Sequence, residues 1–95
     1  MFAGQFCVTG SRLLVQRGVA DKFRELIKTR LERVKVGPAS DPSSDMGPVI
    51  DKANVTRIDK MVEGAIAAGA KVILRGGPIK DGPLAKGAFL SSGLT

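Results

Sequence analysis

Two stretches of helical periodicity, separated by a segment that cannot be helical, constrain the fold of this 95-residue chain most strongly. Apolar side chains recur every three or four positions between residues 19 and 34, and again between residues 55 and 66. Residues 37–48, which lie between them, are rich in Pro, Gly, Ser and Asp, residues that favour turns over helix. The sequence therefore predicts two amphipathic helices joined by a surface loop.

The ends of both helices carry recognisable signals. Asp21 falls in the first turn of the first helix, whose basic residues gather toward its end, as the helix dipole favours. Asp51 is the predicted N-cap of the second helix and Gly69 its C-cap. The predicted buried faces are Phe23, Leu26, Ile27, Leu31 and Val34 in the first helix, and Val55, Ile58, Met61, Val62, Ala65 and Ile66 in the second.

Short apolar stretches predict strands around these helices. The continuous run Leu13, Leu14 and Val15 predicts a strand over residues 12–16 that is buried on both faces. A second short strand is expected over residues 71–74, closed by Gly76-Gly77, and a weakly patterned last strand over residues 87–94. The order strand, helix, helix, strand and possible strand indicates an α/β fold with helices packed on a small sheet.

Composition excludes several classes of function. One cysteine cannot form an intrachain disulfide, and a chain without histidine has no local Cys/His catalytic pair and no Cys/His metal cluster. No apolar run approaches the roughly 20 residues that cross a bilayer, and the N-terminus does not resemble a secretory signal. We therefore expect a cytoplasmic chain with no membrane partner and no metal.

The formal charge of +6 raises the alternative of a basic module that binds nucleic acid or an anionic membrane. The chain has no Trp or Tyr for base stacking, and Asp21, Glu25 and Glu32 interrupt the basic residues. We therefore expect a solvated helix face and no nucleic-acid partner. The basic residues that such binding would use are Lys22, Arg24, Lys28, Arg30, Arg33 and Lys35.

A structural subdomain that assembles with itself or with a missing partner is a third alternative.

The residues around the single cysteine carry the chemistry. The stretch Gly4-Gln5-Phe6-Cys7, followed by Ser11-Arg12-Leu13-Leu14-Val15, closely resembles the active-site signature of the aldehyde dehydrogenase family. The resemblance continues in family order through Lys35-Val36-Gly37, Asp45-Met46-Gly47-Pro48-Val49-Ile50, Gly69-Ala70-Lys71-Val72 and Gly76-Gly77. It departs after Gly87-x-Phe89, where Ser92-Gly93 stands in place of the family's usual Pro-Thr pair.

The resemblance implies that residues 1–95 are part of the cysteine-bearing catalytic domain, with the dinucleotide-binding domain absent. It also implies that Cys7 is the nucleophile that attacks an aldehyde, forming first a thiohemiacetal and then a thioester. In the complete enzyme the cofactor would be NAD or NADP, and we expect a homo-oligomer. A lone cysteine without this signature is more often a buried, inert side chain.

Specific roles follow from the same resemblance. The backbone N–H of Cys7 would donate to the developing oxyanion. Gly4 permits an unusual bend and Gln5 braces it, while Phe6 and Val8 would line a pocket for an apolar or aromatic aldehyde. Arg12 is expected to bond nearby carbonyls rather than to serve as an active-site cation.

Other parts of the family's active site have no counterpart in the sequence. The family's general-base glutamate and its oxyanion asparagine both precede the cysteine, and neither has a candidate residue on this chain. Gly76-Gly77 opens no helix and therefore makes no phosphate cradle. We expect no cofactor bound to the isolated chain, and no activity from it.

Overall fold

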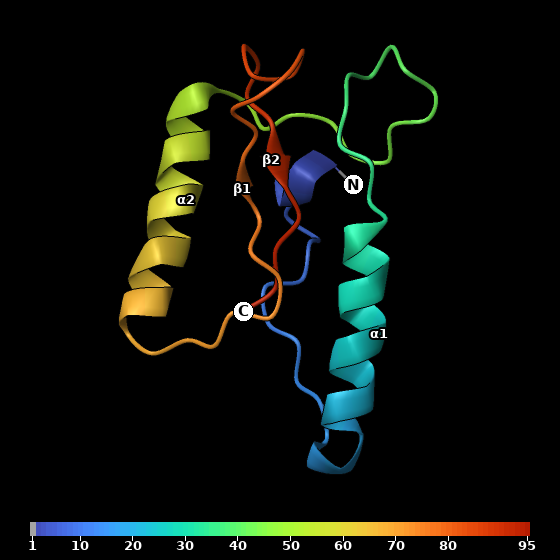
Figure 1. Cartoon of the computed structure of the whole chain (residues 1–95), viewed down its shortest axis with the longest axis vertical. Helices are drawn as coiled ribbons and strands as arrows, with labels where there is room; N and C mark the ends of the chain where they lie inside the picture. The colour runs from blue at the N-terminus through green and yellow to red at the C-terminus, as the bar shows by residue number, and fades with distance from the viewer. Residues whose placement is uncertain (1) are drawn as a thin grey trace.

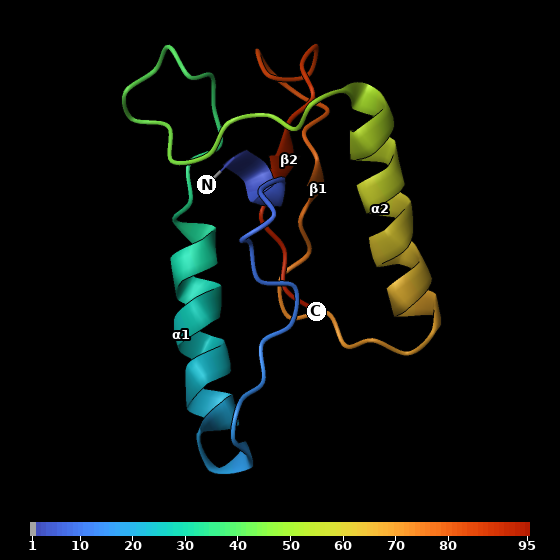
Figure 2. The same cartoon turned by 180° about the vertical axis from the view of Figure 1, so that it is seen from behind.

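The computed structural model describes residues 2–95, and its two helices stand on either side of a small hairpin (Figure 1). Helix α1 spans Ala20–Glu32 and helix α2 spans Lys52–Ala67, while strands β1, Gly77–Pro78, and β2, Leu90–Ser91, form an antiparallel pair. Short 3₁₀ helices occupy Phe2–Gly4 and Arg17–Val19. The two views, front and back, place α1 and α2 on opposite sides of the hairpin (Figure 2). The predicted α/β class is confirmed.

Helix α2 begins and ends where the sequence predicts. The carboxylate of Asp51 accepts a hydrogen bond from the N–H of Asn54 at 2.7 Å, which satisfies one of the free donors of the first turn. At the other end Gly69 adopts φ +102°, and the N–H of Ala70 bonds the carbonyl of Ala65 at 2.9 Å. Val55 is buried on the face turned toward the hairpin.

Helix α1 follows the 3₁₀ turn Arg17–Val19 and ends at Glu32, close to the predicted bounds. An ion pair between Asp21 and Arg24, 2.8 Å long, lies in its first turn. The apolar face of α1 remains partly open, because Leu26 is exposed and Phe23 is at the border of exposure. No helix among residues 2–95 is long and apolar enough to cross a membrane.

The strand predicted over residues 12–16 is not formed. The segment is irregular in the structure, and Leu14 is 94% exposed rather than buried on both faces. A strand exists only when a neighbour takes up its N–H and C=O groups, and no described segment pairs with this one. The prediction was wrong because an apolar run shows what a segment would bury but not whether a partner is present.

The strand predicted over residues 71–74 is displaced toward the C-terminus. Leu74 forms only a single antiparallel bridge with Leu94, and Gly77, predicted to close the strand, instead belongs to β1. Both Ile73 and Leu74 donate their N–H groups to the carbonyl of Leu94, so the ladder is irregular at this point. Strand β2 does lie within the predicted stretch 87–94, where Leu90 pairs with Pro78.

Few side chains are buried in this arrangement. Among the described hydrophobic residues, only Val49, 5% exposed, and Val55, 9% exposed, count as core. The accessible surface is 7311 Å², against roughly 5,200 Å² expected for a compact protein of this mass. The radius of gyration is 14.1 Å, where about 12.4 Å is typical of 95 residues. The fold therefore leaves much apolar surface uncovered.

Candidate active site: the cysteine turn

Two consecutive tight turns present Cys7. The N–H of Gln5 bonds the carbonyl of Phe2 at 3.0 Å, and the N–H of Thr9 bonds the carbonyl of Phe6, also at 3.0 Å. The second bond places Cys7 and Val8 at the two central positions of a four-residue turn. The thiol of Cys7 is exposed at its apex. Residues 2–10 are called the cysteine turn below.

The backbone of the cysteine turn is left-handed where it leads toward the cysteine. Gly4 has φ +76°, in the region that a residue without Cβ enters at little cost. Phe2 and Ala3, at φ 45° and 52°, share this handedness although both carry side chains. The expected bend at Gly4 is therefore present, in a longer left-handed stretch than the sequence predicts.

Both ends of the Gln5 amide are engaged. Its Nε2 donates to the carbonyl of Phe2 at 2.9 Å, which braces the first turn as expected. Its Oε1 accepts the backbone N–H of Ile50 at 2.8 Å. The sequence carries no signal for this second contact, because Ile50 lies 45 positions away. Among the hydrogen bonds of residues 2–95, it is the only one that joins the cysteine turn to the rest of the chain.

Phe6 and Val8 flank the cysteine on an open surface. Both side chains are exposed, and the ring of Phe6 stacks on that of Phe2 with centroids 5.3 Å apart. Neither residue lines any of the three main cavities of residues 2–95. The aldehyde pocket expected around them stays a prediction.

Several polar groups in the cysteine turn have no partner among the described residues, and two of them lie at or next to the proposed site. The backbone N–H of Cys7 enters no hydrogen bond there, so it is free to donate to a bound oxygen atom. The hydroxyl of Thr9 is buried and likewise without a partner. Sequence reasoning did not single out Thr9, because burial of one hydroxyl leaves no pattern in the sequence.

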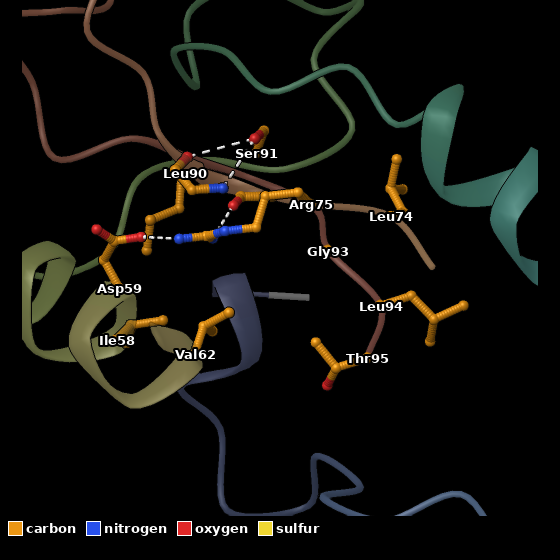
Figure 3. A pocket seen from close by; sticks show the side chains of 12 residues that line it. Ile58, Asp59, Val62, Leu74, Arg75, Leu90, Ser91, Gly93, Leu94 and Thr95 are labelled. Atoms are coloured by element: carbon orange, nitrogen blue, oxygen red, sulfur yellow. Dashed lines mark hydrogen bonds and ion pairs between the residues drawn. The ribbon is translucent and has the colours of Figure 1, made fainter. Parts of the chain in front are cut away.

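One ionisable side chain, Arg75, lies in a cavity away from the cysteine turn. Arg75 lines a cavity of about 230 Å³ between α2 and the hairpin, where Figure 3 shows it reaching Asp59. It bonds Asp59 at 2.7 Å and Glu63 at 2.5 Å, and these hydrogen bonds, that to Asp59 first, raise the pKa of Arg75. Its charge is already paired, so this cavity offers no free cation to a ligand.

Arg12 does not make the contacts predicted for it. The residue lines an open trough between α1 and the chain around Ile73, and no hydrogen bond joins it to another described residue. The expected bonds to nearby carbonyls are therefore not formed. The segment that carries Arg12 lacks sheet partners, so no strand carbonyls are held close to its guanidinium.

The Gly76-Gly77 pair does not form a phosphate-binding loop. Gly76-Gly77 runs into strand β1 instead of opening a helix, so its N–H groups do not converge on a phosphate. A Cβ at Gly76 would overlap the backbone of Ser91 and Ser92, which explains the glycine by close packing of the hairpin. Within residues 2–95 no three His, Cys, Asp or Glu side chains are grouped as metal ligands.

Comparison with known proteins indicates the same family as the signature around Cys7. The sequence model of the aldehyde dehydrogenase family matches residues 1–94 of this chain. Betaine aldehyde dehydrogenase from Staphylococcus aureus, solved with NAD⁺ and with a BME-modified cysteine, is 35% identical with a TM-score of 0.87, over 97% of this chain and 19% of that one.

A second solved structure shares the fold at lower identity. It is a cysteine-to-alanine mutant of aldehyde dehydrogenase C from Pseudomonas syringae, solved with NAD⁺ and octanal. The two chains are 23% identical with a TM-score of 0.84, over 96% of this chain and 19% of that one. The present chain thus spans less than a fifth of the length of these relatives. With the profile matched over residues 1–94, the chain belongs to the aldehyde dehydrogenase family.

Proposed function

We propose that Cys7 is the nucleophile of an NAD(P)-dependent aldehyde oxidation, carried out by a protein of full family length that contains these residues. The observation that carries the proposal is the exposed thiol at the apex of the glycine-led double turn, beside an N–H group that no described residue uses. A nucleophilic thiol needs access to its substrate, and a developing oxyanion needs a donor. The cysteine turn supplies both.

The bond changes assigned to this chain are centred on sulfur. The thiolate of Cys7 forms a bond to the aldehyde carbon, and the carbonyl electron pair moves onto oxygen. The N–H of Cys7 donates to that oxygen in the resulting thiohemiacetal. Oxidation at the same carbon gives a thioester, and water then displaces the sulfur to release a carboxylic acid and restore the thiol.

The cofactor and the general base lie outside the described residues. NAD or NADP takes up the hydride in such an oxidation. The Gly76-Gly77 pair opens no helix, which supports a cofactor site elsewhere in a longer protein, and no step through the nicotinamide is assigned to residues 2–95. The NAD⁺ complexes of the relatives support NAD as the acceptor. The modified cysteine of the Staphylococcus aureus enzyme supports a thiol open to small reagents.

The substrate class follows from the neighbours of Cys7. Phe6 and Val8 are both apolar and exposed beside the thiol. We propose that they form one wall of a pocket that prefers an apolar or aromatic aldehyde, because a charged group would lose water there without gaining a partner.

The role of Cys7 is tested by substitution in an aldehyde dehydrogenase of full family length that carries these 95 residues. Replacing Cys7→Ser should lower kcat by about a thousandfold or more, because a hydroxyl is a far weaker nucleophile near neutral pH. The matched control is Lys80→Ala, an exposed change in the loop after β1, which should leave kcat unchanged. Full activity of the Cys7→Ser enzyme would refute the proposal.

A second test uses the 95-residue chain by itself. We expect calorimetric titration with NAD⁺ to give no heat of binding, because Gly76-Gly77 runs into strand β1 and opens no helix that could cradle a phosphate. Tight binding of NAD⁺ to this chain would contradict the assignment of the cofactor site to other residues.

A further inference from the structure

We propose that Gln5 is a positioning residue, which holds the cysteine turn against the chain in front of α2 by one side-chain hydrogen bond. The inference rests on the role proposed for Cys7 and adds what fixes that cysteine in place. Its basis is that the bond from the Ile50 N–H to Gln5 Oε1, 2.8 Å long, is the only hydrogen bond between residues 2–10 and the remainder of the described chain.

The two ends of the Gln5 side chain have different requirements. Nε2 donates to the carbonyl of Phe2, whereas Oε1 accepts from the N–H of Ile50. A primary amide offers a donor and an acceptor at once, and glutamate offers only acceptors when ionised. Leucine, of similar size, offers neither. The contact therefore explains why an amide of this length stands two residues before the cysteine.

The anchor at Ile50 lies between two well-held residues. Val49 is 5% exposed, and its N–H bonds the carbonyl of Ala88 at 2.9 Å. Asp51 caps α2 through the N–H of Asn54. Gln5 thus joins the cysteine turn to a backbone segment whose neighbours on both sides form hydrogen bonds.

Little else holds the cysteine turn in place. The rings of Phe2 and Phe6 stack on each other and stay exposed, and the buried hydroxyl of Thr9 bonds to no described residue. The position of the Cys7 sulfur relative to the body of the molecule therefore depends on Gln5. A displacement of about 1 Å in a reacting group costs roughly a hundredfold in rate.

Hydrogen exchange tests the contact without requiring activity. In the 95-residue chain, Gln5→Leu should lower the protection of the Ile50 amide by about tenfold while the α2 amides keep theirs. Gln5→Glu retains the acceptor and should retain most of that protection. Ile50→Ala is the matched control, since the side chain is 79% exposed and its N–H remains; residue 50 should stay protected. Unchanged exchange at Ile50 in the Gln5→Leu chain would overturn the proposal.

Kinetics in an enzyme of full family length test the positioning role. Gln5→Leu should lower kcat by at least about tenfold and leave KM unchanged, because the sulfur is misplaced while the substrate pocket remains. Ile50→Pro, which removes the N–H and also fixes φ of residue 50, should do the same, and the double variant should be no worse than either single one. Circular dichroism checks that α2 stays folded. Should Ile50→Pro unfold α2, the Gln5→Leu kinetics and Ile50 exchange decide the question.

Additive effects of the two substitutions, or a change in KM alone, would contradict the positioning role. The outcomes also separate this inference from the proposed function. If Cys7→Ser keeps full activity, the function proposed for Cys7 fails, whereas the exchange of the Ile50 amide still reports whether Gln5 holds the turn.

Discussion

At the scale of single residues, Cys7 is exposed, whereas most lone cysteines in small domains are buried and inert. Its thiol is exposed because it occupies a central position of a tight turn that follows a left-handed stretch ending at Gly4, φ +76°. The left-handed entry and the Gln5 contacts shape the turn on which this thiol lies.

The unpartnered hydroxyl of Thr9 leads to a prediction about stability. Thr9→Val replaces the hydroxyl by a methyl group of similar size and removes an unsatisfied polar atom. The free energy of unfolding should rise by about 1 kcal/mol, because the folded chain no longer loses the hydration of a hydroxyl that has no hydrogen-bond partner. Urea titration followed by circular dichroism measures the change.

A control separates the hydroxyl from the methyl group at this position. Thr9→Ser keeps the hydroxyl and removes the methyl group, which lies beside Gly4, 3.9 Å from where a Cβ on that residue would stand. The Thr9→Ser chain should therefore be no more stable than the parent chain. A less stable Thr9→Val chain would show that the hydroxyl has a partner after all.

Helices and strands differ, at the element scale, in how far the sequence predicts them. The caps of α2 at Asp51 and Gly69 are where the sequence places them, because the bonds of a helix and its ends are local. The strand predicted over residues 12–16 is absent, because its bonds depend on a neighbour that local pattern cannot supply.

The same distinction applies to the cysteine turn. The bend at Gly4 and the bracing of Phe2 by Gln5 were predictable, because both are contacts between neighbours in the sequence. The bond to Ile50 spans 45 positions and depends on how the loop over residues 37–48 returns the chain toward the turn. No local pattern encodes such a contact.

Asp41, in the loop between the helices, should make the stability of the chain depend on pH. Hydrogen bonds from Ser43, side chain first and then backbone, together with Lys35, lower the pKa of Asp41 to about 2 from its ordinary 3.8. The contribution of Asp41 to stability is therefore fully present above pH 3.8 and disappears as the pH falls through about 2. The measurement is the unfolding midpoint of the parent chain and of Asp41→Asn between pH 2 and 7.

Near neutral pH the Asp41→Asn chain should unfold at a lower denaturant concentration than the parent chain. The two unfolding midpoints should converge near pH 2. The effect should be small, because both partners in the ion pair with Lys35 are exposed. Asp81→Asn, a change at an exposed loop carboxylate without a hydrogen bond among the described residues, serves as the control. A constant difference across the whole pH range would contradict the explanation.

The amount of open surface is the main feature at the scale of the whole molecule. The chain exposes 7311 Å² and buries little beyond Val49 and Val55, while Leu14 is 94% exposed. Exposed apolar side chains in such number are typical of a surface that contacts another protein, a membrane or a ligand. The chain spans less than a fifth of its relatives' length, and we propose that further residues of a full-length enzyme, or other subunits of a homo-oligomer, cover this surface.

The central claim is that Cys7 carries the acyl group during turnover, and peptide mass spectrometry after acid quenching tests it most directly. In an enzyme of full family length that carries these residues, turning over an aldehyde, the peptide with Cys7 should gain the mass of the acyl group, and hydroxylamine should remove it. Steady turnover with no acyl group on Cys7, under quenching that preserves thioesters, would contradict the account.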